Sequence, residues 1–322
     1  MAIDALTLAT ADIEVTVLVD KGADILALVD RASGIDLLAK APWGLRDPAR
    51  APGETSSFVA WLDRWSGGWQ VLFPTGGGPC VHGGIELDYH GEAAIVPWTC
   101  ERTGDAAATL EVMLAHSPFH LRRELRLDGR TLELRETVTN LGGDEEAFMW
   151  VHHPLFGPPL LGPGARLEAS AGTVTADAER DGRCNPLQPG ETGAWPQAVA
   201  KDGGTLDLSR LPGPDEPRAL MAYLGDFTRG RLAVVNSHVG LELQWPAELL
   251  PYAWLFQEVH ASPGYPWYRR AYLLGAEPAS SVPGAGLARA IENGTALTLA
   301  PGAARTLELT ATVLRPRRTA PA

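Results

Sequence analysis

The chain has 322 residues, a formal net charge of −12 and a hydrophobic fraction of 45%. That length suits one large β-domain or two average domains, and the acidic charge argues against a surface of clustered Lys and Arg that binds nucleic acid. No apolar run approaches the ~20 residues of a membrane span. No basic region precedes an apolar stretch at the N-terminus, so we expect no signal peptide, no membrane contact and a cytoplasmic location.

The sequence is punctuated by 35 glycines and 26 prolines, roughly a fifth of its residues, and this density favours short strands over long helices. Apolar and polar side chains alternate over residues 13–18, which predicts a strand. Residues 55–65 predict a short helix, capped by Thr55 or Ser56. Alternation returns at residues 107–114. Two alternating runs within residues 121–140 flank Asp128-Gly129, which predicts a β-hairpin.

The second half of the chain continues the strand pattern. Loops are predicted at residues 157–164, 182–197 and 203–217. Further strands are predicted at residues 220–224, 230–235 and 240–245. A second short helix is expected near residues 247–250, and residues 296–314 hold two strands joined by a Pro301-Gly302 turn. No repeat or linker divides the chain, so we predict one all-β domain over residues 1–322. Its expected architecture is a large antiparallel β-sandwich with a few short helices.

The first group of chemically active side chains lies within residues 67–98 and includes Trp69, His90 and Glu92. A cupin-type metal site needs two His separated by one residue and then a Glu. One of those His is missing here, so we expect no metal. The chain has ten Trp residues, which fit either a sandwich core or a sugar cleft where pyranose faces stack on indole rings.

Two adjacent histidines form the second group, within residues 148–157. His152 and His153 lie in an extended segment, where neighbouring side chains point to opposite faces, so only one of them can face a given cleft. Histidine exchanges protons near neutral pH. A hydrogen-bonded structural role is the alternative for each of the two.

The third group, residues 251–278, is rich in aromatic side chains and carries two acids, Glu258 and Glu277. Trp254 and Trp267 are its candidates for lining a cleft. The apolar stretch before Glu277 indicates a buried strand that delivers this carboxylate at its end. Partial desolvation would raise the carboxyl pKa toward useful basicity. For either Glu, a salt bridge at a cleft rim is the alternative.

These groups, in this order, resemble the aldose 1-epimerase (galactose mutarotase) family. His90-Gly91-Glu92-Ala93, followed by Trp98, resembles the His-Gly-Phe-Ala-Arg segment of the hexose-phosphate branch, which has a Trp at the same spacing. His153-Pro154-Leu155-Phe156 resembles a His-Pro-Tyr-Phe segment, and Glu277-Pro278 resembles a late Glu before Pro. The resemblance extends over residues 67–313.

The resemblance implies a β-supersandwich with a cleft on one concave sheet face. It also implies epimerisation of a free sugar at the anomeric carbon, without metal or cofactor. By this likeness Glu277 is the general base for the C1 hydroxyl, and His153 is the general acid for the ring oxygen. His90 would hold a sugar oxygen and help to polarise the ring oxygen.

Four departures from the family pattern refine these expectations. Ala94 replaces the Arg of the phosphate branch and Glu92 replaces its Phe, which favours a neutral sugar over a sugar phosphate. Leu155 replaces the Tyr, and the neighbouring His152 leaves the identity of the acid open. We expect further substrate contacts from the following residues: Arg64, Trp69, Glu92, His152, Trp254, Glu258 and Trp267.

Two other functions remain open from the sequence. A carbohydrate-binding protein on the same fold would not need the acid and the base. A glycoside hydrolase or lyase would pair Glu277 or Glu92 with Glu258, since hydrolases place two carboxyl groups about 5–9.5 Å apart. In every case the expected partner is a small sugar, and the expected assembly is a monomer or a homodimer.

Overall fold

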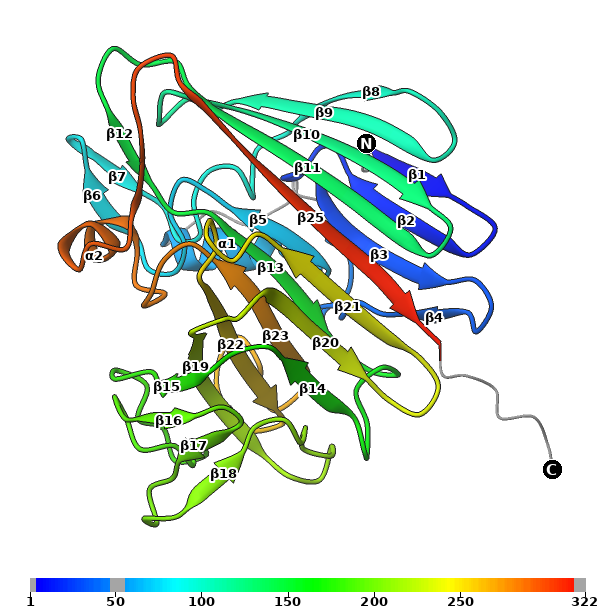
Figure 1. Ribbon diagram of the computed structural model, residues 1–322, viewed down its shortest axis with the longest axis vertical. Coiled ribbons are helices and arrows are strands. Elements are labelled where there is room, and N and C mark those ends of the chain that lie inside the picture. Colours follow the sequence, from blue (N-terminus) through cyan, green and yellow to red (C-terminus); the bar gives the residue numbers. More distant parts are fainter. Residues whose placement is uncertain (1–3, 47–55, 316–322) are drawn as a thin grey trace.

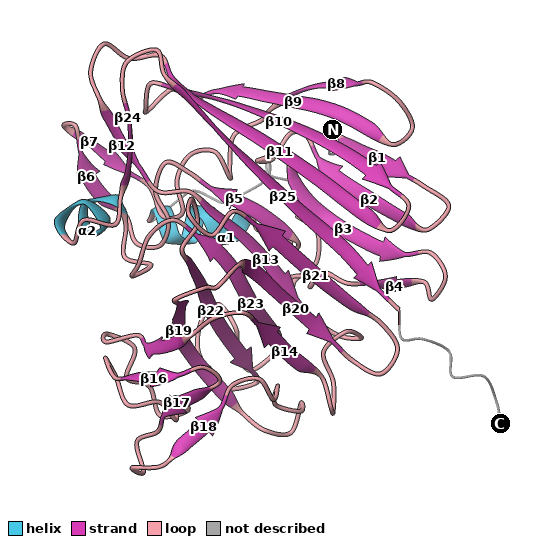
Figure 2. Cartoon of the chain, viewed as in Figure 1, coloured by secondary structure: helices cyan, strands magenta, loops and turns pink. Residues whose placement is uncertain are grey.

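The structure is a computed structural model that describes residues 4–46 and 56–315. Strands dominate it, and they form two large antiparallel sheets packed face to face (Figure 1, Figure 2). The predicted all-β sandwich is therefore confirmed. Within the described part of the chain, no helix has the length and apolar character needed to cross a bilayer.

The larger sheet has eleven strands, and its middle strands lie at the centre of the molecule. Its neighbours run in the order β1 (Ala5–Ala9), β2 (Ile13–Leu18), β3 (Asp24–Asp30), β5 (Trp69–Leu72), β13 (Val151–Phe156), β23 (Tyr272–Ala279), β22 (Tyr252–Val259), β19 (Arg218–Gly225), β15 (Thr173–Ala176) and β16 (Thr192–Ala194), with β4 (Ile35–Asp36) on β3.

The second of the two large sheets has eight strands. Its order is β14 (Arg166–Ala169), β20 (Gly230–Val235), β21 (Gly240–Trp245), β25 (Ala304–Leu314), β11 (Thr131–Asn140), β10 (Phe119–Asp128), β9 (Ala107–Met113) and β8 (Thr99–Arg102).

Short elements fill the ends of the sandwich. Three strand pairs stand apart from the large sheets: β6 (Cys80–His82) with β7 (Ile85–Leu87), β12 (Glu146–Phe148) with β24 (Leu297–Leu299), and β17 (Gln197–Val199) with β18 (Thr205–Asp207). The helices of the described residues are α1 (Ser57–Arg64) and α2 (Leu287–Glu292).

Most strand predictions are confirmed. Residues 13–18, 230–235 and 240–245 are strands β2, β20 and β21. The hairpin around Asp128-Gly129 is β10–β11, and Gly129 takes the left-handed backbone that the tight turn requires (φ 54°).

The helix predictions are partly confirmed. Helix α1 begins after Ser56, whose hydroxyl accepts from the Val59 N–H at 3.3 Å, as an N-cap does. Thr55 lies outside the described residues. Residues 247–250 form a turn and not a helix, so that prediction is wrong. Helix α2 was not predicted, because it is one short stretch without a side-chain cap.

Two of the predicted loops contain short strands. Residues 182–197 include β16, and residues 203–217 include β18. Strands of three residues are too short to show a period of two in the sequence. They are specified by their partners, as β18 is by β17.

The core lies between the two large sheets. Along β10, buried and partly exposed residues alternate, and Leu121, Leu125 and Leu127 face inward. Fully burying such a side chain stabilises the fold by roughly 1.5–3 kcal/mol. Aliphatic side chains from most strands of both large sheets join this core.

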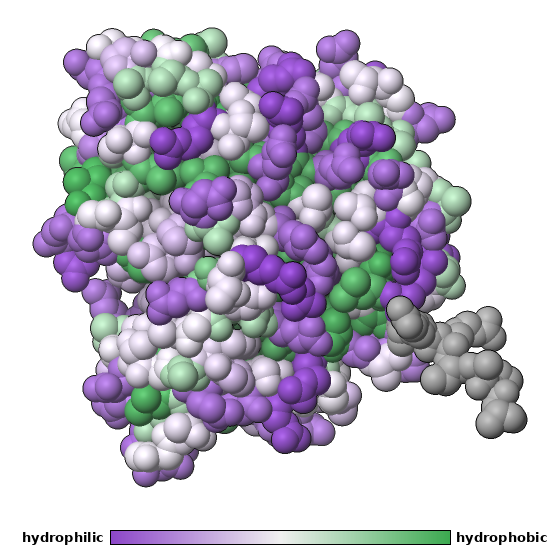
Figure 3. Space-filling view, in the orientation of Figure 1, coloured by the Kyte–Doolittle hydropathy of each residue, from purple (hydrophilic) through white to green (hydrophobic). Residues whose placement is uncertain are grey.

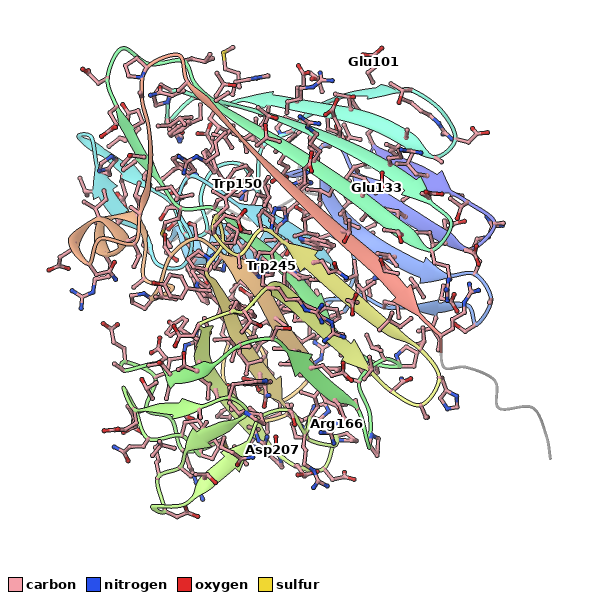
Figure 4. The ribbon with its side chains drawn as sticks, viewed as in Figure 1. Glu101, Glu133, Trp150, Arg166, Asp207 and Trp245 are labelled. Carbon is pink, nitrogen blue, oxygen red and sulfur yellow. The ribbon has the colours of Figure 1, made fainter. Side chains whose placement is uncertain are left out.

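A buried ion pair links the two sheets within that core. Arg123 on β10 contacts Glu136 on β11 at 2.5 Å, and its guanidinium also donates at 2.7 Å to the carbonyl of Ala23, in the turn that leads into β3 of the opposite sheet. Trp150, near the middle of Figure 4, donates its indole N–H to Glu136 at 2.9 Å. Burial alone would raise the pKa of Glu136, but Arg123 and His152 outweigh it and lower this pKa to about 2. The carboxylate is therefore ionised and holds both sheets.

The outward face of the eight-stranded sheet is charged. Arg122 contacts Glu111 at 2.5 Å and Glu124 at 2.9 Å across β9 and β10, and Arg135 on β11 contacts Glu308 on β25 at 3.4 Å. Figure 3 shows hydrophilic side chains spread over this side of the molecule. These opposite charges alternate on a solvated sheet face, where each exposed pair contributes little to stability.

The central strands of the larger sheet are different, because they are covered on both faces. Every residue of β13 and of β23 is buried. The second sheet covers one face, while α1 and the loops around it cover the other. Polar side chains on these strands are thus held in a dry environment, and those that face α1 border a pocket.

Candidate active site

The pocket lies against the centre of the larger sheet, and its volume is about 160 Å³. The strands β13, β22 and β23 form its floor, and helix α1 forms one wall. Its lining residues are Phe58, Trp61, Leu62, Trp65, Gly77, Tyr89, His90, His153, Leu155, Arg180, Met221, Trp254, Phe256, Trp267, Glu277 and Gly284. Thus His90, His153, Trp254, Trp267 and Glu277, all named from the sequence, come together here.

His152 and His153 point to opposite faces of β13, as adjacent residues on a strand do. His153 lines the pocket. His152 is fully buried in the sandwich, where its Nδ1 accepts from the Trp69 indole N–H at 3.2 Å and its Nε2 lies 3.2 Å from Glu136. The structure therefore gives His152 and Trp69 partners in the core and leaves His153 as the histidine of β13 in the pocket.

Glu277 lies beside His153 on the neighbouring strand. Its Oε1 is 3.6 Å from Nε2 of His153, and the residue is only 2% exposed. Gly275 makes room for it: a Cβ added there would lie 2.1 Å from Oε1 of Glu277. A side chain at position 275 would push this carboxyl group away from His153.

Burial decides the charge of both groups. It raises the pKa of Glu277 well above its usual range, although Arg180 opposes the shift. It also lowers the pKa of His153 to about 3, with a smaller contribution from the Lys21 ammonium. Burial therefore favours a neutral imidazole and a protonated carboxyl group in this pair. These opposite pKa shifts in neighbouring groups suit an exchange of one proton between Glu277 and His153.

Gln70 fixes the tautomer of His153. The Gln70 amide nitrogen donates to Asp24 at 3.1 Å and to the Gly67 carbonyl at 2.7 Å, so its oxygen Oε1 must face the other way. This oxygen lies 3.2 Å from Nδ1 of His153. An amide oxygen can only accept; hence Nδ1 carries the hydrogen, and Nε2 presents its lone pair to Glu277.

His90 is held in the opposite tautomer. Its Nδ1 accepts from the Gly77 N–H at 2.9 Å, which leaves the hydrogen on Nε2. Burial lowers the pKa of His90 well below its usual range, so the ring is a neutral donor. Its backbone is in the left-handed region (φ 64°) and donates to the Gly77 carbonyl at 3.1 Å. Gly77 itself packs closely against Gly284. A Cβ added to Gly77 would lie 1.9 Å from the Gly284 carbonyl oxygen.

Aromatic rings wall the pocket. Trp61 stacks on Trp65 with ring centroids 6.0 Å apart, and it makes T-shaped contacts with the rings of His90 and His153 at centroid distances of 4.7 and 5.8 Å. The indole N–H of Trp61 is buried and has no hydrogen-bond partner among the described residues. An unpaired buried donor costs about 1–3 kcal/mol, and a ligand oxygen would satisfy it.

Among the described residues of the lining, Arg180 is the only Lys or Arg, and the sequence reasoning missed it. Its Cζ lies 5.6 Å from the Phe256 ring centroid. The backbone around it is tied down by Asp177, whose Oδ1 accepts from the N–H groups of Glu179 and Arg180 at 2.9 and 2.8 Å. An Asp two or three residues before a turn is a common signal, but it does not indicate where the following side chain goes.

The other polar residues proposed from the sequence do not line the pocket. Arg64 donates to the Ala60 carbonyl of its own helix at 3.0 Å. Glu92 accepts from the N–H groups of Ala115 and His116 at 2.8 and 2.9 Å. Glu258 accepts from the N–H groups of Ala261 and Ser262 at 3.0 and 2.9 Å.

The two carboxylates Glu92 and Glu258 thus stabilise loops. Consequently the argument that Glu92 would repel a negatively charged sugar no longer applies. Elsewhere in the described chain, no group of three or more His, Cys, Asp or Glu side chains is arranged to hold a metal ion.

The sequence was compared with protein families and with curated proteins. The profile of a family described as a domain of unknown function (DUF4432) matches residues 1–313. A search of curated proteins found no significant match.

Solved structures resemble the whole chain. The Slr1438 protein from Synechocystis has a TM-score of 0.71 at 18% identity, with 98% of this chain and 97% of that chain covered. A galactose mutarotase-like protein from Lactobacillus casei has a TM-score of 0.63 at 18% identity, with 97% and 100% covered. An aldose epimerase homologue from C. elegans has a TM-score of 0.60 at 13% identity, with 98% and 99% covered. At such identities the likeness shows the fold, which is galactose mutarotase-like.

Proposed function

The chain belongs to the family described as a domain of unknown function (DUF4432), and from this premise and the geometry of its pocket we propose that it is an aldose 1-epimerase-like enzyme. It would interconvert the α and β anomers of a free sugar by opening and closing the ring. The observation that carries the proposal is the His153–Glu277 pair, with Nε2 and Oε1 3.6 Å apart inside an aromatic pocket.

The reaction needs one acid and one base acting together. A base takes the proton of the C1 hydroxyl while an acid protonates the ring oxygen, and each contribution is typically worth 10²–10⁴-fold. The pair supplies both from one shared proton. Because the oxygens O1 and O5 are bonded to the same carbon, two adjacent groups on neighbouring strands can reach both.

We assign Glu277 as the base and His153 as the acid. Burial favours the proton on Glu277, so we infer that substrate binding moves it to Nε2 of His153. Sugar hydroxyls that donate to the carboxylate, together with the nearby Arg180 charge, favour this transfer because they stabilise the ionised form of Glu277.

The remaining steps need no other group. As Glu277 takes the proton from O1 and His153 gives its proton to O5, the C1–O5 bond breaks and the aldehyde forms. His90 donates its Nε2–H to a sugar oxygen during opening. The aldehyde rotates about C1–C2, and closure from the other face runs the same proton transfers in reverse. At the end the pair again holds one proton.

A hydrolase or lyase that uses two carboxylates has less support. Among the described residues that line the pocket, Glu277 is the only carboxylate. Glu92 and Glu258 are engaged by backbone N–H groups elsewhere. A carbohydrate-binding protein without catalysis would use the same pocket, and activity measurements separate that alternative from the proposal.

Saturation-transfer NMR of anomeric exchange tests the proposed function. We expect accelerated exchange for at least one unprotected sugar, unchanged by EDTA and lost in Glu277→Gln. Glu101→Gln, an exposed substitution on β8 (Figure 4), is the matched control and should keep the wild-type rate. Absence of acceleration for aldoses, uronic acids and 6-deoxy sugars alike would reject an epimerase.

A further inference from the structure

We propose that Arg180 forms a carboxylate subsite and that the sugar is a hexuronate, bound with its C6 carboxylate on this guanidinium. The inference rests on the proposed function, because it deepens the assignment of the same pocket. It is carried by the unpaired state of Arg180, by the way its loop is built and by its position relative to the His153–Glu277 pair.

Arg180 has no acidic partner among the described residues. Its guanidinium lies over the Phe256 ring, and no described carboxylate forms an ion pair with it, although its charge acts on Glu277. The neighbouring Asp181 is paired with Lys201 instead. Arg180 is an exposed residue that lines the pocket, so its N–H groups are open to a ligand. A planar guanidinium on an aromatic face can bind a carboxylate with two parallel hydrogen bonds.

The loop that carries Arg180 is held at both sides of this residue. Buried Asp177 accepts its N–H at 2.8 Å, and buried Asn185 donates to its carbonyl at 2.6 Å. The other oxygen of Asp177 accepts the hydroxyl of Tyr223, and that hydroxyl in turn accepts from the Gly284 N–H at 3.1 Å. Asp177 is thus occupied by the loop and does not neutralise Arg180, and the loop is anchored to the pocket wall.

The strand order places Arg180 at the correct side of the pocket. His153 is on β13, Glu277 on β23 and Phe256 on β22, three successive strands of the larger sheet. Neighbouring strands lie ≈ 4.8 Å apart, so a guanidinium above Phe256 is about one strand from Glu277. In a pyranose, C5 is bonded to the ring oxygen, and the C6 group is therefore near C1. A sugar with C1 and O5 at the pair can reach Arg180 with C6.

The charge balance favours a carboxylate over a phosphate. Arg180 is the only Lys or Arg among the described residues of the lining, and His90 is a neutral donor. In the substrate complex the proton on His153 balances the ionised Glu277. One guanidinium matches the single charge of a carboxylate, whereas a phosphate dianion would leave one charge without a cation among the described residues of the lining. Glu92, which would have repelled an anion, faces a loop elsewhere.

The test compares sugars and variants by the ratio of kcat/KM for anomeric exchange. The substrates are D-glucuronate and D-galacturonate, the parent aldoses, and the corresponding 6-phosphates. The variants are Arg180→Gln and Arg180→Lys, with Arg183→Gln, exposed on the same loop, as the matched control. A ratio is used because loss of Arg180 also changes the environment of Glu277 for every substrate.

We expect the wild type to prefer one hexuronate over its parent aldose. Arg180→Gln should reduce the uronate-to-aldose ratio of kcat/KM by about 10- to 100-fold, because hydrogen bonds to a charged group are lost. Arg180→Lys should reduce this ratio less. Arg183→Gln should leave it unchanged. An unchanged ratio in Arg180→Gln, or preference for the 6-phosphates, would overturn the inference while the epimerase survives.

A binding measurement separates this inference from the proposed function. If no sugar shows accelerated exchange, calorimetric titration with the two hexuronates decides the subsite alone. Binding that is weakened by about 10-fold or more in Arg180→Gln, but not in Arg183→Gln, supports the carboxylate site without catalysis. Equal affinity in the wild type and in Arg180→Gln would overturn it.

Discussion

Oε1 of Gln70 lies 3.2 Å from Nδ1 of His153, and this contact determines which nitrogen of the histidine faces the pocket. The amide is oriented by Asp24, which is itself buried against Lys21. A chain of hydrogen bonds thus runs from a buried ion pair on one side of β5 to the reacting proton. It keeps the lone pair of Nε2 directed at Glu277, ready to accept the proton that the acid later donates.

Removing this contact should slow the reaction without removing a group that touches the sugar. In Gln70→Met, Nδ1 of His153 loses its acceptor, and the tautomers become mixed. We expect kcat to fall by about 10-fold or more, with KM changed less, because the loss of one oriented hydrogen bond is worth about 1.4 kcal/mol. The ¹⁵N chemical shifts of His153 report the tautomer directly.

Gln257→Met is the matched control for this substitution. Gln257 is a buried glutamine on β22 of the same sheet, and neither atom of its amide has a hydrogen-bond partner among the described residues. The control should keep both the rate and the His153 tautomer. Equal rate losses in the two variants would show that Gln70 acts only by supporting the fold.

Glu277 should destabilise the protein increasingly as the pH rises. Its pKa is raised by burial, so the folded state keeps a proton that the unfolded state has released above pH ~4.5. Glu277→Gln removes this dependence. We expect the variant to gain unfolding free energy over the wild type as the pH rises above ~4.5, measured by urea unfolding at several pH values. A difference that stays constant or shrinks with pH would contradict a buried, neutral Glu277.

Acid should have the opposite effect through His153. Its pKa is about 3 in the folded state, so between pH ~6.5 and 3 the unfolded state binds a proton that the folded state does not. The wild type should lose stability over this range. In His153→Asn the loss should be smaller, which unfolding curves at pH 4 and 7 would measure. An unchanged acid dependence would indicate that this histidine is already charged.

The two adjacent histidines should respond differently to the same substitution. His153→Asn should lose at least ~10² in rate, since a general acid is removed. His152→Asn should instead lose about 1–3 kcal/mol of stability, because the Trp69 N–H and Glu136 lose a buried partner. Anomeric exchange per folded molecule and thermal unfolding distinguish these effects. A catalytic loss in His152→Asn alone would shift the role of the acid by one residue.

Gly275→Ala tests whether the position of Glu277 matters as much as its presence. The new Cβ would lie 2.1 Å from Oε1 of Glu277 and would force the carboxyl group away from His153. We expect kcat to fall by about 10²-fold, the size of effect that a displacement of 1 Å can have. Gly143→Ala adds a methyl group into open space and should not change the rate.

The alternation of apolar and polar residues was sufficient to predict those parts of the fold and of the site that depend on residues close together in the sequence. Alternation gave β2, β10, β11, β20 and β21, and it predicted that His152 and His153 face opposite ways. The apolar run before Glu277 indicated a buried strand, and β23 is one. In each case the deciding contact lies within one strand or hairpin.

Residues whose partners are distant in the chain were missed or misplaced. Gln70, Trp61 and Arg180 enter the pocket region only because β5, α1 and the loop after β15 meet around β13 and β23. No local pattern distinguishes Arg180 from other loop arginines. Glu92 was misjudged for the same reason: its carboxylate is used by the N–H groups of a loop that follows a different strand.

The central claim is that His153 and Glu277 act as one unit that shares a proton. The most direct test is the rate of anomeric exchange in His153→Asn, in Glu277→Gln and in the double variant, each measured on folded protein. The account predicts a loss of at least ~10² in each single variant and no further loss in the double variant, since residues that act together are not additive. Wild-type rates in either single variant, or losses that multiply in the double variant, would contradict it.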